Sequence, residues 1–162
     1  MFSDLGALSP LDGRYYSSAK ELNAYFSEAA LMQYRIYVEV EYLLALAKQK
    51  EIRKRLLIDG KEQSKLRKLY QSFDLNAAKE IKEIEKKINH DVKAVEYYIQ
   101  DKTRSSLHPW IHFALTSEDV NNISYSLMWK HALEKVYLPS ALSLQRKLLD
   151  LIKEHRKSPM LS

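Results

Sequence analysis

Apolar residues recur every three or four positions along most of the chain, a pattern that predicts amphipathic helices. The longest early run extends from Ser27 to about Lys48, and its expected inward positions are Leu31, Tyr34, Val38, Tyr42 and Ala45. Shorter helices are predicted over residues 18–25 and, after a break at Asp59 and Gly60, over residues 61–73 with Leu66, Leu69 and Tyr70 on one side. Further helices are predicted around Ile81, Ile84 and Ile88, capped by Asp74 or Asn76, and around Val92, Val95 and Ile99. No segment shows the sustained alternation of a strand, so we expect an all-α fold.

The second half of the pattern predicts one short and two long helices. A short helix is expected over residues 108–113, with Pro109 in its first turn. Ser117 is expected to cap a longer helix, and Pro139 to kink it or start a new one that runs to about His155. The expected inward positions are Val120, Ile123, Leu127, Leu142, Leu148, Leu149 and Ile152.

Two long amphipathic helices cannot bury their apolar faces alone, so we expect them to pack on further chain or on other subunits. The expected domains are a compact helical domain over residues 1–110 and the start of a second helical domain over 111–162.

The composition is that of a folded protein. Of the 162 residues, 46% are hydrophobic and 29% are charged, and there are only 3 Gly and 4 Pro. The chain has no Cys, no apolar run long enough to span a bilayer and no secretion signal at its first residues. These features predict a soluble, cytoplasmic protein without membrane contact.

The net charge of +5 favours anionic partners. The densest basic run, residues 48–55, falls where the first long helix is expected to end, and cations are favourable there because of the helix macrodipole. We therefore interpret this run as a solvated helix end, expect no nucleic-acid partner, and expect small ligands that carry phosphate or carboxylate.

Thr116 and Ser117 place two hydroxyls and free N–H groups at a helix start, where carboxylate or phosphate oxygens bind. Taken alone, this pair is better explained as an ordinary helix cap. Asn121 and Asn122 follow one turn later, and amides are poor helix formers. Their benefit must lie in ligand contact or in a buried hydrogen-bond network.

Two further polar clusters are candidates for ligand contact. Asn89, His90 and Asp91 combine an amide, an imidazole and a carboxylate at a helix start, and the simpler interpretation is a cap at Asn89 or Asp91 beside an exposed histidine. Arg14 and Tyr15 follow a turn and could hold a phosphate and a base, although alone they read as a surface loop.

Other sites of chemistry have little support in the sequence. His108 and His112 have the i,i+4 spacing of metal ligands, but the residues between them supply no base and no third ligand is evident. We interpret the pair as structural, with Trp110 and Phe113 in the core, and expect no metal. A Gly-rich phosphate loop and a Gly-x-Ser-x-Gly elbow are both absent from the sequence.

Three segments together resemble the adenylosuccinate lyases, in their bacterial form, of the fumarase/aspartase superfamily. The segments run over residues 9–15 (Ser-Pro-Leu-Asp-Gly-Arg-Tyr), 89–97 (Asn-His-Asp-Val-Lys-Ala-Val-Glu-Tyr) and 112–122 (His-Phe-Ala-Leu-Thr-Ser-Glu-Asp-Val-Asn-Asn). The Thr-Ser-x-Asp element indicates only the superfamily, whereas the other two segments narrow the resemblance to this member.

The resemblance implies a β-elimination without cofactor. Adenylosuccinate would be split into AMP and fumarate, and the succinylaminoimidazole-carboxamide ribotide into its carboxamide ribotide and fumarate. By position, Arg14 and Tyr15 would contact the nucleotide. Asn89, His90 and Asp91 would line the substrate site, with His90 as a possible auxiliary in proton transfer. Thr116 and Ser117 would bind the succinyl group.

The resemblance also implies parts that these residues lack. A Thr-His-Gly-Gln segment with the general acid, and a Ser-rich loop with the general base, do not occur in the sequence. We therefore expect an N-terminal piece of the enzyme that is inactive alone, with residues 111–162 opening the central helical bundle of a homotetramer. Two rival interpretations are another lyase of the superfamily, such as one acting on argininosuccinate, and a non-catalytic helical interaction module.

Overall fold

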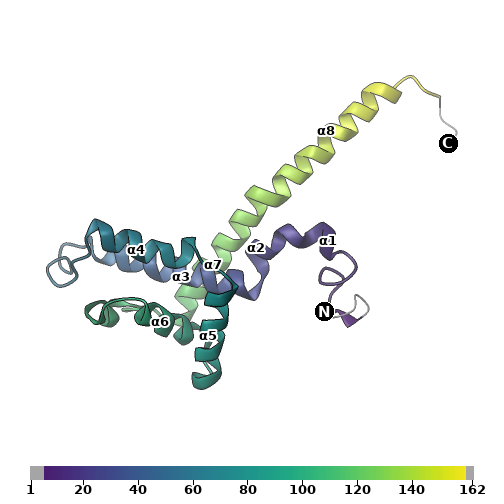
Figure 1. Cartoon of the computed structure of the whole chain (residues 1–162). Helices are drawn as coiled ribbons and strands as arrows, with labels where there is room; N and C mark the ends of the chain where they lie inside the picture. Colours follow the sequence, from purple (N-terminus) through teal and green to yellow (C-terminus); the bar gives the residue numbers. More distant parts are fainter. Residues whose placement is uncertain (1–5, 160–162) are drawn as a thin grey trace. The chain divides into compact units, whose positions relative to one another are not determined.

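The computed structural model describes residues 6–159, and its regular elements are all helical (Figure 1). The expected all-α fold class is thereby confirmed for this range. Within the described residues, internal contacts divide the chain into a larger unit, residues 24–128, and a smaller unit, residues 6–23 with 129–159. Within the range described, no helix is long and apolar enough to cross a membrane.

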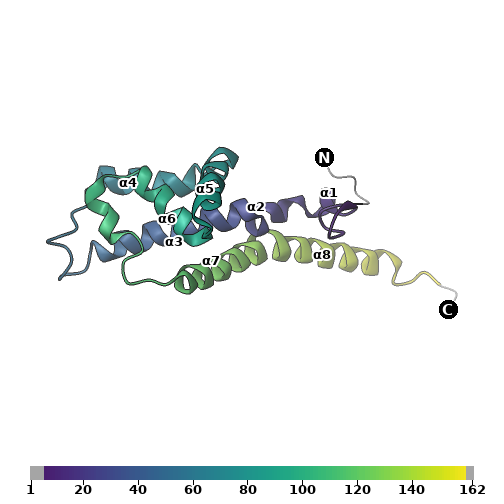
Figure 2. The same ribbon diagram turned by 90° about the horizontal axis from the view of Figure 1, so that it is seen from below.

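The larger unit is built around α3 (Glu28–Leu46), which packs against α4 (Gly60–Gln71), α5 (Leu75–Ile88) and α6 (Asp91–Asp101). In Figures 1 and 2, α4 lies beside α3 in both views, while α5 crosses at a steep angle. A bidentate ion pair joins the two helices: Nε and Nη2 of Arg67 in α4 donate to Oε1 and Oε2 of Glu41 in α3, at 2.8 and 3.0 Å.

Capping side chains fix where these helices begin. Ser27 accepts the Ala30 N–H at 3.1 Å, Asp59 accepts the Glu62 N–H at 2.8 Å, and Asp74 accepts the N–H groups of Asn76 and Ala77. The predicted start at Ser27 is confirmed, and of the two caps expected for α5, Asp74 and Asn76, the structure has Asp74. The predicted break at Asp59 and Gly60 is the cap and first residue of α4.

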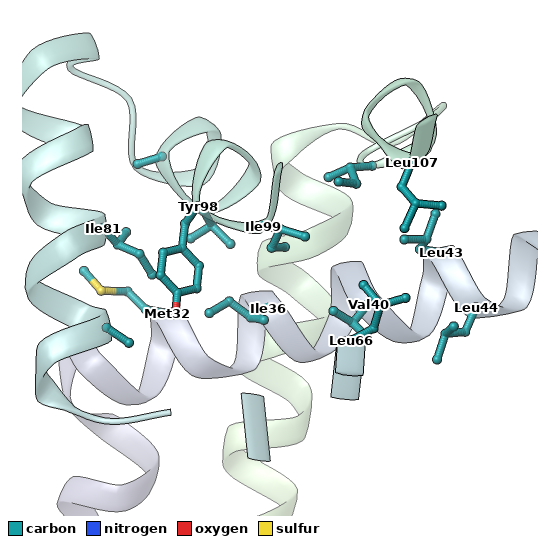
Figure 3. Packing of buried hydrophobic residues seen from close by; sticks show 14 of the residues in the cluster. Met32, Ile36, Val40, Leu43, Leu44, Leu66, Ile81, Tyr98, Ile99 and Leu107 are labelled. Atoms are coloured by element: carbon teal, nitrogen blue, oxygen red, sulfur yellow. The ribbon is translucent and has the colours of Figure 1, made fainter. Parts of the chain in front are cut away.

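The core lies between α3 and the helices packed on it. Figure 3 shows Met32, Ile36, Val40 and Leu43 along α3, facing side chains that include Ile81, Tyr98, Ile99 and Leu107. The predicted inward positions of α4, α5 and α6 agree with this core, since Leu66, Ile81, Val92, Val95 and Ile99 are buried.

The predicted inward face of α3 is wrong in part. Val38 is buried, but Leu31, Tyr34 and Tyr42 are half-buried and Ala45 is exposed. The physical reason is that α3 is covered on more than one side, so its apolar residues form no single narrow stripe and spacing alone selects the wrong one.

The segment after α6 departs from the prediction. A 3₁₀ helix, η3, spans Ser105–Trp110 and has Pro109 near its end, so the helix expected over residues 108–113 is wrong. His112 and Ala114 have φ values of 60° and 58°, in the left-handed region, which ends the helical path before α7. Trp110 packs partly buried against the core, whereas Phe113 is 45% exposed and not the core residue expected.

Three helical elements follow without an intervening loop: α7 (Ser117–Ala132), a π-helical turn η4 (Leu133–Tyr137) and α8 (Leu138–His155). Pro139 stands in the first turn of α8, where its missing N–H costs nothing. A π turn stands directly before it, closed by the Leu138 N–H on the Leu133 carbonyl. The backbone stays helical through this turn, so the proline coincides with a local change of winding and not with a new helix start.

The apolar residues of these elements are buried only in part. Val120 and Met128 are buried, but Ile123 is 49% exposed. No α8 residue is buried, so the expected burial of Leu142, Leu148, Leu149 and Ile152 does not occur within this chain. Before α3, short turns α1 (Tyr16–Ala19), η2 (Lys20–Leu22) and α2 (Asn23–Phe26) replace the single helix expected over residues 18–25.

Candidate functional site

The Asn89–Asp91 cluster is the junction between α5 and α6. Asn89 ends α5 in the left-handed conformation, with φ 54°, which asparagine tolerates well. His90 itself caps α6, because its Nδ1 accepts the Lys93 N–H at 3.2 Å. The expected cap at Asn89 or Asp91 is therefore corrected to His90. An Nδ1 that accepts a hydrogen bond leaves the hydrogen on Nε2, so the half-exposed ring retains one donor for a ligand.

Asp91 is held by a buried arginine of α3. Arg35 Nη2 lies 2.6 Å from Asp91 Oδ2, and Asp91 Oδ1 accepts the Val92 N–H at 2.8 Å. Burial alone would raise the pKa of Asp91, but these hydrogen bonds and the arginine charge outweigh it and hold the pKa below its usual value.

The same arginine reaches α7. Arg35 Nε donates to Asn121 Oδ1 at 2.9 Å, while the Arg35 side chain is only 5% exposed. One guanidinium thus ties the first turn of α6 to the second turn of α7. Asn121 is accordingly part of a partly buried hydrogen-bond network around Arg35, which is close to one of the two functions expected for it. Asn122 is exposed, and its carbonyl accepts the Ser126 hydroxyl.

Thr116 caps α7 through a reciprocal capping box. Its N–H and hydroxyl donate to Asp119 Oδ2 at 2.7 and 2.8 Å, and its Oγ1 accepts the Asp119 N–H at 3.3 Å. The expected cap at Ser117 is wrong by one residue. These bonds from Thr116 lower the pKa of Asp119, so the carboxylate stays ionised at the helix mouth.

The capping box decides which groups at this helix start remain available to an anion. The Thr116 hydroxyl is already engaged, whereas the Ser117 hydroxyl makes no hydrogen bond within residues 6–159. The N–H groups of Ser117 and Glu118 stand in the first turn, where no intrahelical acceptor exists. An incoming carboxylate therefore meets Ser117 and these N–H groups, with the Asp119 charge as a competitor.

A second buried network joins α3, α6 and the segment before α7. Both Glu39 oxygens accept from His112, Oε1 from the ring Nδ1 at 2.5 Å and Oε2 from the backbone N–H at 3.1 Å. Glu96 Oε1 lies 3.7 Å from the other ring nitrogen, and its Oε2 accepts from Lys93 at 2.7 Å. Burial raises the pKa of Glu39, and the bonds and charge of His112 offset this in part.

Arg35, Glu39 and Glu96 were not predicted from the sequence to belong to these networks. The available signal was two charged residues four positions apart, Arg35 and Glu39, inside a mostly apolar helix. Such residues share a helix face and are rarely buried unless they are paired.

The predicted site residues divide between the two units. Arg14 and Tyr15 belong to the smaller unit, where Arg14 lies over the Tyr15 ring at 5.1 Å from its centroid. The other predicted site residues belong to the larger unit. Among them, Thr116 and Ser117 make no direct hydrogen bond to residues 89–91 within the described range.

The two histidines expected to be structural have separate partners. His108 Nε2 lies 3.3 Å from the Thr103 carbonyl, and His112 belongs to the Glu39 network. Across residues 6–159 no group of three or more His, Asp or Glu side chains could hold a metal ion.

Comparison with known proteins gives a consistent result. A family model described as Lyase matches residues 13–162. An adenylosuccinate lyase of Legionella pneumophila (strain Philadelphia 1) is 43% identical over 163 residues, which is 98% of this chain and 36% of the relative. Adenylosuccinate lyases of Dictyostelium discoideum and Escherichia coli K12 are 39% and 41% identical, each over 99% of this chain and 36% of their own length.

The chain thus spans little more than a third of the length of these relatives. The matched region contains the Asn-His-Asp junction, the capped start of α7 and both buried networks. Because the family model covers nearly every residue of the chain, this protein belongs to the lyase family.

Proposed function

We propose that the chain contributes part of the substrate site of an adenylosuccinate lyase. That enzyme would cleave adenylosuccinate to AMP and fumarate, and the succinylaminoimidazole-carboxamide ribotide to its carboxamide ribotide and fumarate, in purine nucleotide biosynthesis. The relatives support the assignment, because those named here are adenylosuccinate lyases that match 98–99% of the chain. The observation that carries the site is Arg35, which ties the two polar helix starts together.

The substrate has a charge distribution that suits these groups. Its succinyl part carries two carboxylates, which the Ser117 hydroxyl and the free N–H groups of the first turn of α7 would bind. The Nε2–H of His90 would donate to a second anionic group or assist proton transfer. Arg14 would hold the phosphate and Tyr15 would pack on the nucleoside.

A β-elimination needs more than binding. A base must remove a proton from the succinyl Cβ, an acid must protonate the leaving nitrogen, and donors must stabilise the charge that develops on the adjacent carboxylate. The residues proposed here supply the donors. The motifs in which the resemblance places the acid and the base do not occur among the 162 residues. We therefore expect no fumarate release from adenylosuccinate by this chain alone.

Assembly and location are part of the same proposal. We infer a cytoplasmic homotetramer in which the central helical bundle joins the subunits. The exposed apolar residues of α8 support this proposal, because a helix with such a face is stabilised by packing on other helices.

A chimera tests the proposal directly. The segment of the Legionella pneumophila relative that aligns with this chain is replaced by residues 1–162, and cleavage of adenylosuccinate and of argininosuccinate is followed by fumarate release. We expect activity on adenylosuccinate only. A folded chimera that cleaves argininosuccinate instead, or neither substrate, would overturn the assignment.

Variants of the chimera test the site. Ser117→Ala removes the unengaged hydroxyl and should lower kcat, and with it kcat/KM, by about 100- to 1000-fold, the loss of kcat seen when one such donor is removed. Ser126→Ala is the matched control, because the Ser126 hydroxyl bonds only to the carbonyl one turn back in α7, and it should leave kcat/KM within about twofold. Equal effects of the two changes would remove Ser117 from the site.

A further inference from the structure

The positive charge of the chain is concentrated in one segment of the larger unit, residues 48–68, here called the basic loop. It includes the connection from α3 to α4 and, from residue 60 to residue 68, most of α4 itself. It carries nine Lys and Arg against three Asp and Glu, a net charge of +6. The remaining residues carry 17 basic and 18 acidic side chains, so the basic loop accounts for the entire positive balance of +5.

The acidic residues of the basic loop are mostly engaged. Asp59 caps α4, and Glu62 pairs with Arg104 at 2.8 Å. Among the cations, Arg67 is paired with Glu41. The other eight are exposed and make no ion pair within the described residues: Lys48, Lys50, Arg53, Lys54, Arg55, Lys61, Lys65 and Lys68. Only the carboxylates of Glu51 and of the capping residue Asp59 are left within this segment to oppose them.

The loop that displays these cations is ordered by its own turns and by anchors. The N–H groups of Arg53 and Arg55 donate to the carbonyls of Gln49 and Ile52, both at 2.8 Å. Leu56 is fully buried in the core and Ile52 packs against it, while Arg104 donates to the Leu57 carbonyl. A preorganised display of charge loses less conformational entropy when it binds a partner.

The helix macrodipole does not account for this charge. Because α3 ends at Leu46, Arg53, Lys54 and Arg55 lie well beyond its last turn, where the dipole has no effect. Lys61 stands in the first turn of α4, at the end where cations are unfavourable. The run does begin at the end of α3, but the helix end accounts for Lys48 and Lys50 at most and leaves Arg53, Lys54 and Arg55 unexplained. A nucleic-acid partner therefore has to be considered again.

We propose that the basic loop binds the phosphate backbone of nucleic acid without sequence preference. Residues 48–68 contain no aromatic side chain on which bases could stack, and phosphates are what the exposed ammonium and guanidinium groups recognise. Leu57 is the sole large hydrophobic residue exposed in this segment of the structure. A protein partner would bury an apolar centre, and a membrane-surface helix would present a row of apolar residues.

The test is fluorescence anisotropy of labelled oligouridylate and of a labelled DNA duplex, titrated with the 162-residue chain at several salt concentrations. We expect both to bind at low salt, with log K falling linearly against log salt by about 0.7–0.9 per phosphate neutralised. Neutralising Arg53, Lys54 and Arg55 to Gln should weaken binding by about tenfold or more and flatten the slope by about two to three.

The matched control neutralises Lys79, Lys87 and Lys130, which are exposed and carry the same charge elsewhere. It should weaken binding by less than about threefold, the general effect of net charge. Circular dichroism establishes that both triple variants fold. Absence of binding at low salt, or equal weakening by the two variants, would overturn the proposal. Binding to phosphatidylserine vesicles but to neither nucleic acid would overturn it in favour of a membrane surface.

Discussion

Two buried charged residues of the larger unit, Arg35 and Glu39, are expected to contribute strongly to its stability. Arg35 and Glu39 lie one turn apart on α3, and each satisfies partners on elements far along the chain. A buried charge destabilises the fold unless hydrogen bonds and opposite charges compensate for its lost hydration. Removing one member of such a network therefore leaves the other buried without compensation and lowers the free energy of unfolding. Stability measurements at these positions therefore report on the networks directly.

Replacing Glu39 by an apolar residue should lower the stability of the chain more than replacing it by a neutral polar residue. Glu39→Leu leaves the His112 ring and backbone N–H without acceptors, and urea unfolding should show a loss of about 2–4 kcal/mol. Glu39→Gln should cost less than half of this. Its carbonyl can accept the backbone N–H while its amide donates to Nδ1, provided the ring hydrogen moves to Nε2 beside Glu96. Equal losses in the two variants would refute this account.

Asp91 should contribute to stability above its folded pKa and lose that contribution in acid. Because its pKa is lowered on folding, the unfolded chain binds the proton more readily. The contribution is thus complete above the ordinary value of 3.8 and disappears as the pH falls through the lower folded value. The unfolding midpoints of the chain and of Asp91→Asn should therefore differ at pH 7 and converge toward pH 2. A gap that stays constant with pH would contradict the prediction.

At the scale of elements, each of the helices α3 to α7 begins at a capping side chain. The start of α7 has both a structural role and a proposed functional role. Thr116 closes the capping box, while Ser117 and the free N–H groups beside it face the ligand in our proposal. The two tasks can be separated, because they rest on different side chains.

Thr116→Ala should destabilise the chain by about 0.5–2 kcal/mol, since it removes the hydroxyl that bonds Asp119. Thr116→Ser keeps the hydroxyl and should retain most of the stability. Urea unfolding of both variants checks this, and Ser126→Ala again serves as a control on the same helix. If Thr116→Ala and Thr116→Ser unfold at the same midpoint, the capping box does not stabilise α7.

At the scale of the whole molecule, α8 is the element with the least internal support. Its six Leu and Ile residues between 142 and 152 are all about half or more exposed, and they cover roughly half of the helix circumference. The predicted domain boundary between residues 110 and 111 stays a prediction, because contacts within one chain do not decide how such a helix is covered in an assembly.

The exposed face of α8 should make the isolated chain self-associate. Sedimentation analysis should show oligomers whose fraction rises with concentration, and Leu148→Glu with Ile152→Glu should shift the chain toward monomer. Changing Ser143 and Lys147, which lie on the opposite side of the same helix, to Glu introduces as many new carboxylates without touching the apolar face and should leave the oligomers in place. A monodisperse monomer at all concentrations would count against the prediction.

The sequence by itself determined the helical class, most helix positions and the helix start at Ser27, and it narrowed the cap of α5 to Asp74 or Asn76. These features depend on residues within a few positions of one another, so spacing and capping chemistry suffice to predict them. The resemblance in three short segments likewise identified the family that the comparison then showed.

Only the tertiary structure decided which polar residues work together. Arg35 meets Asp91 and Asn121 across 56 and 86 positions, and Glu39 meets His112 across 73. Periodicity tells which residues share a helix face but not which face meets which helix. For the same reason the inward face of α3, the unusual backbone at His112 and the exposed setting of the basic loop emerge only after the helices have packed.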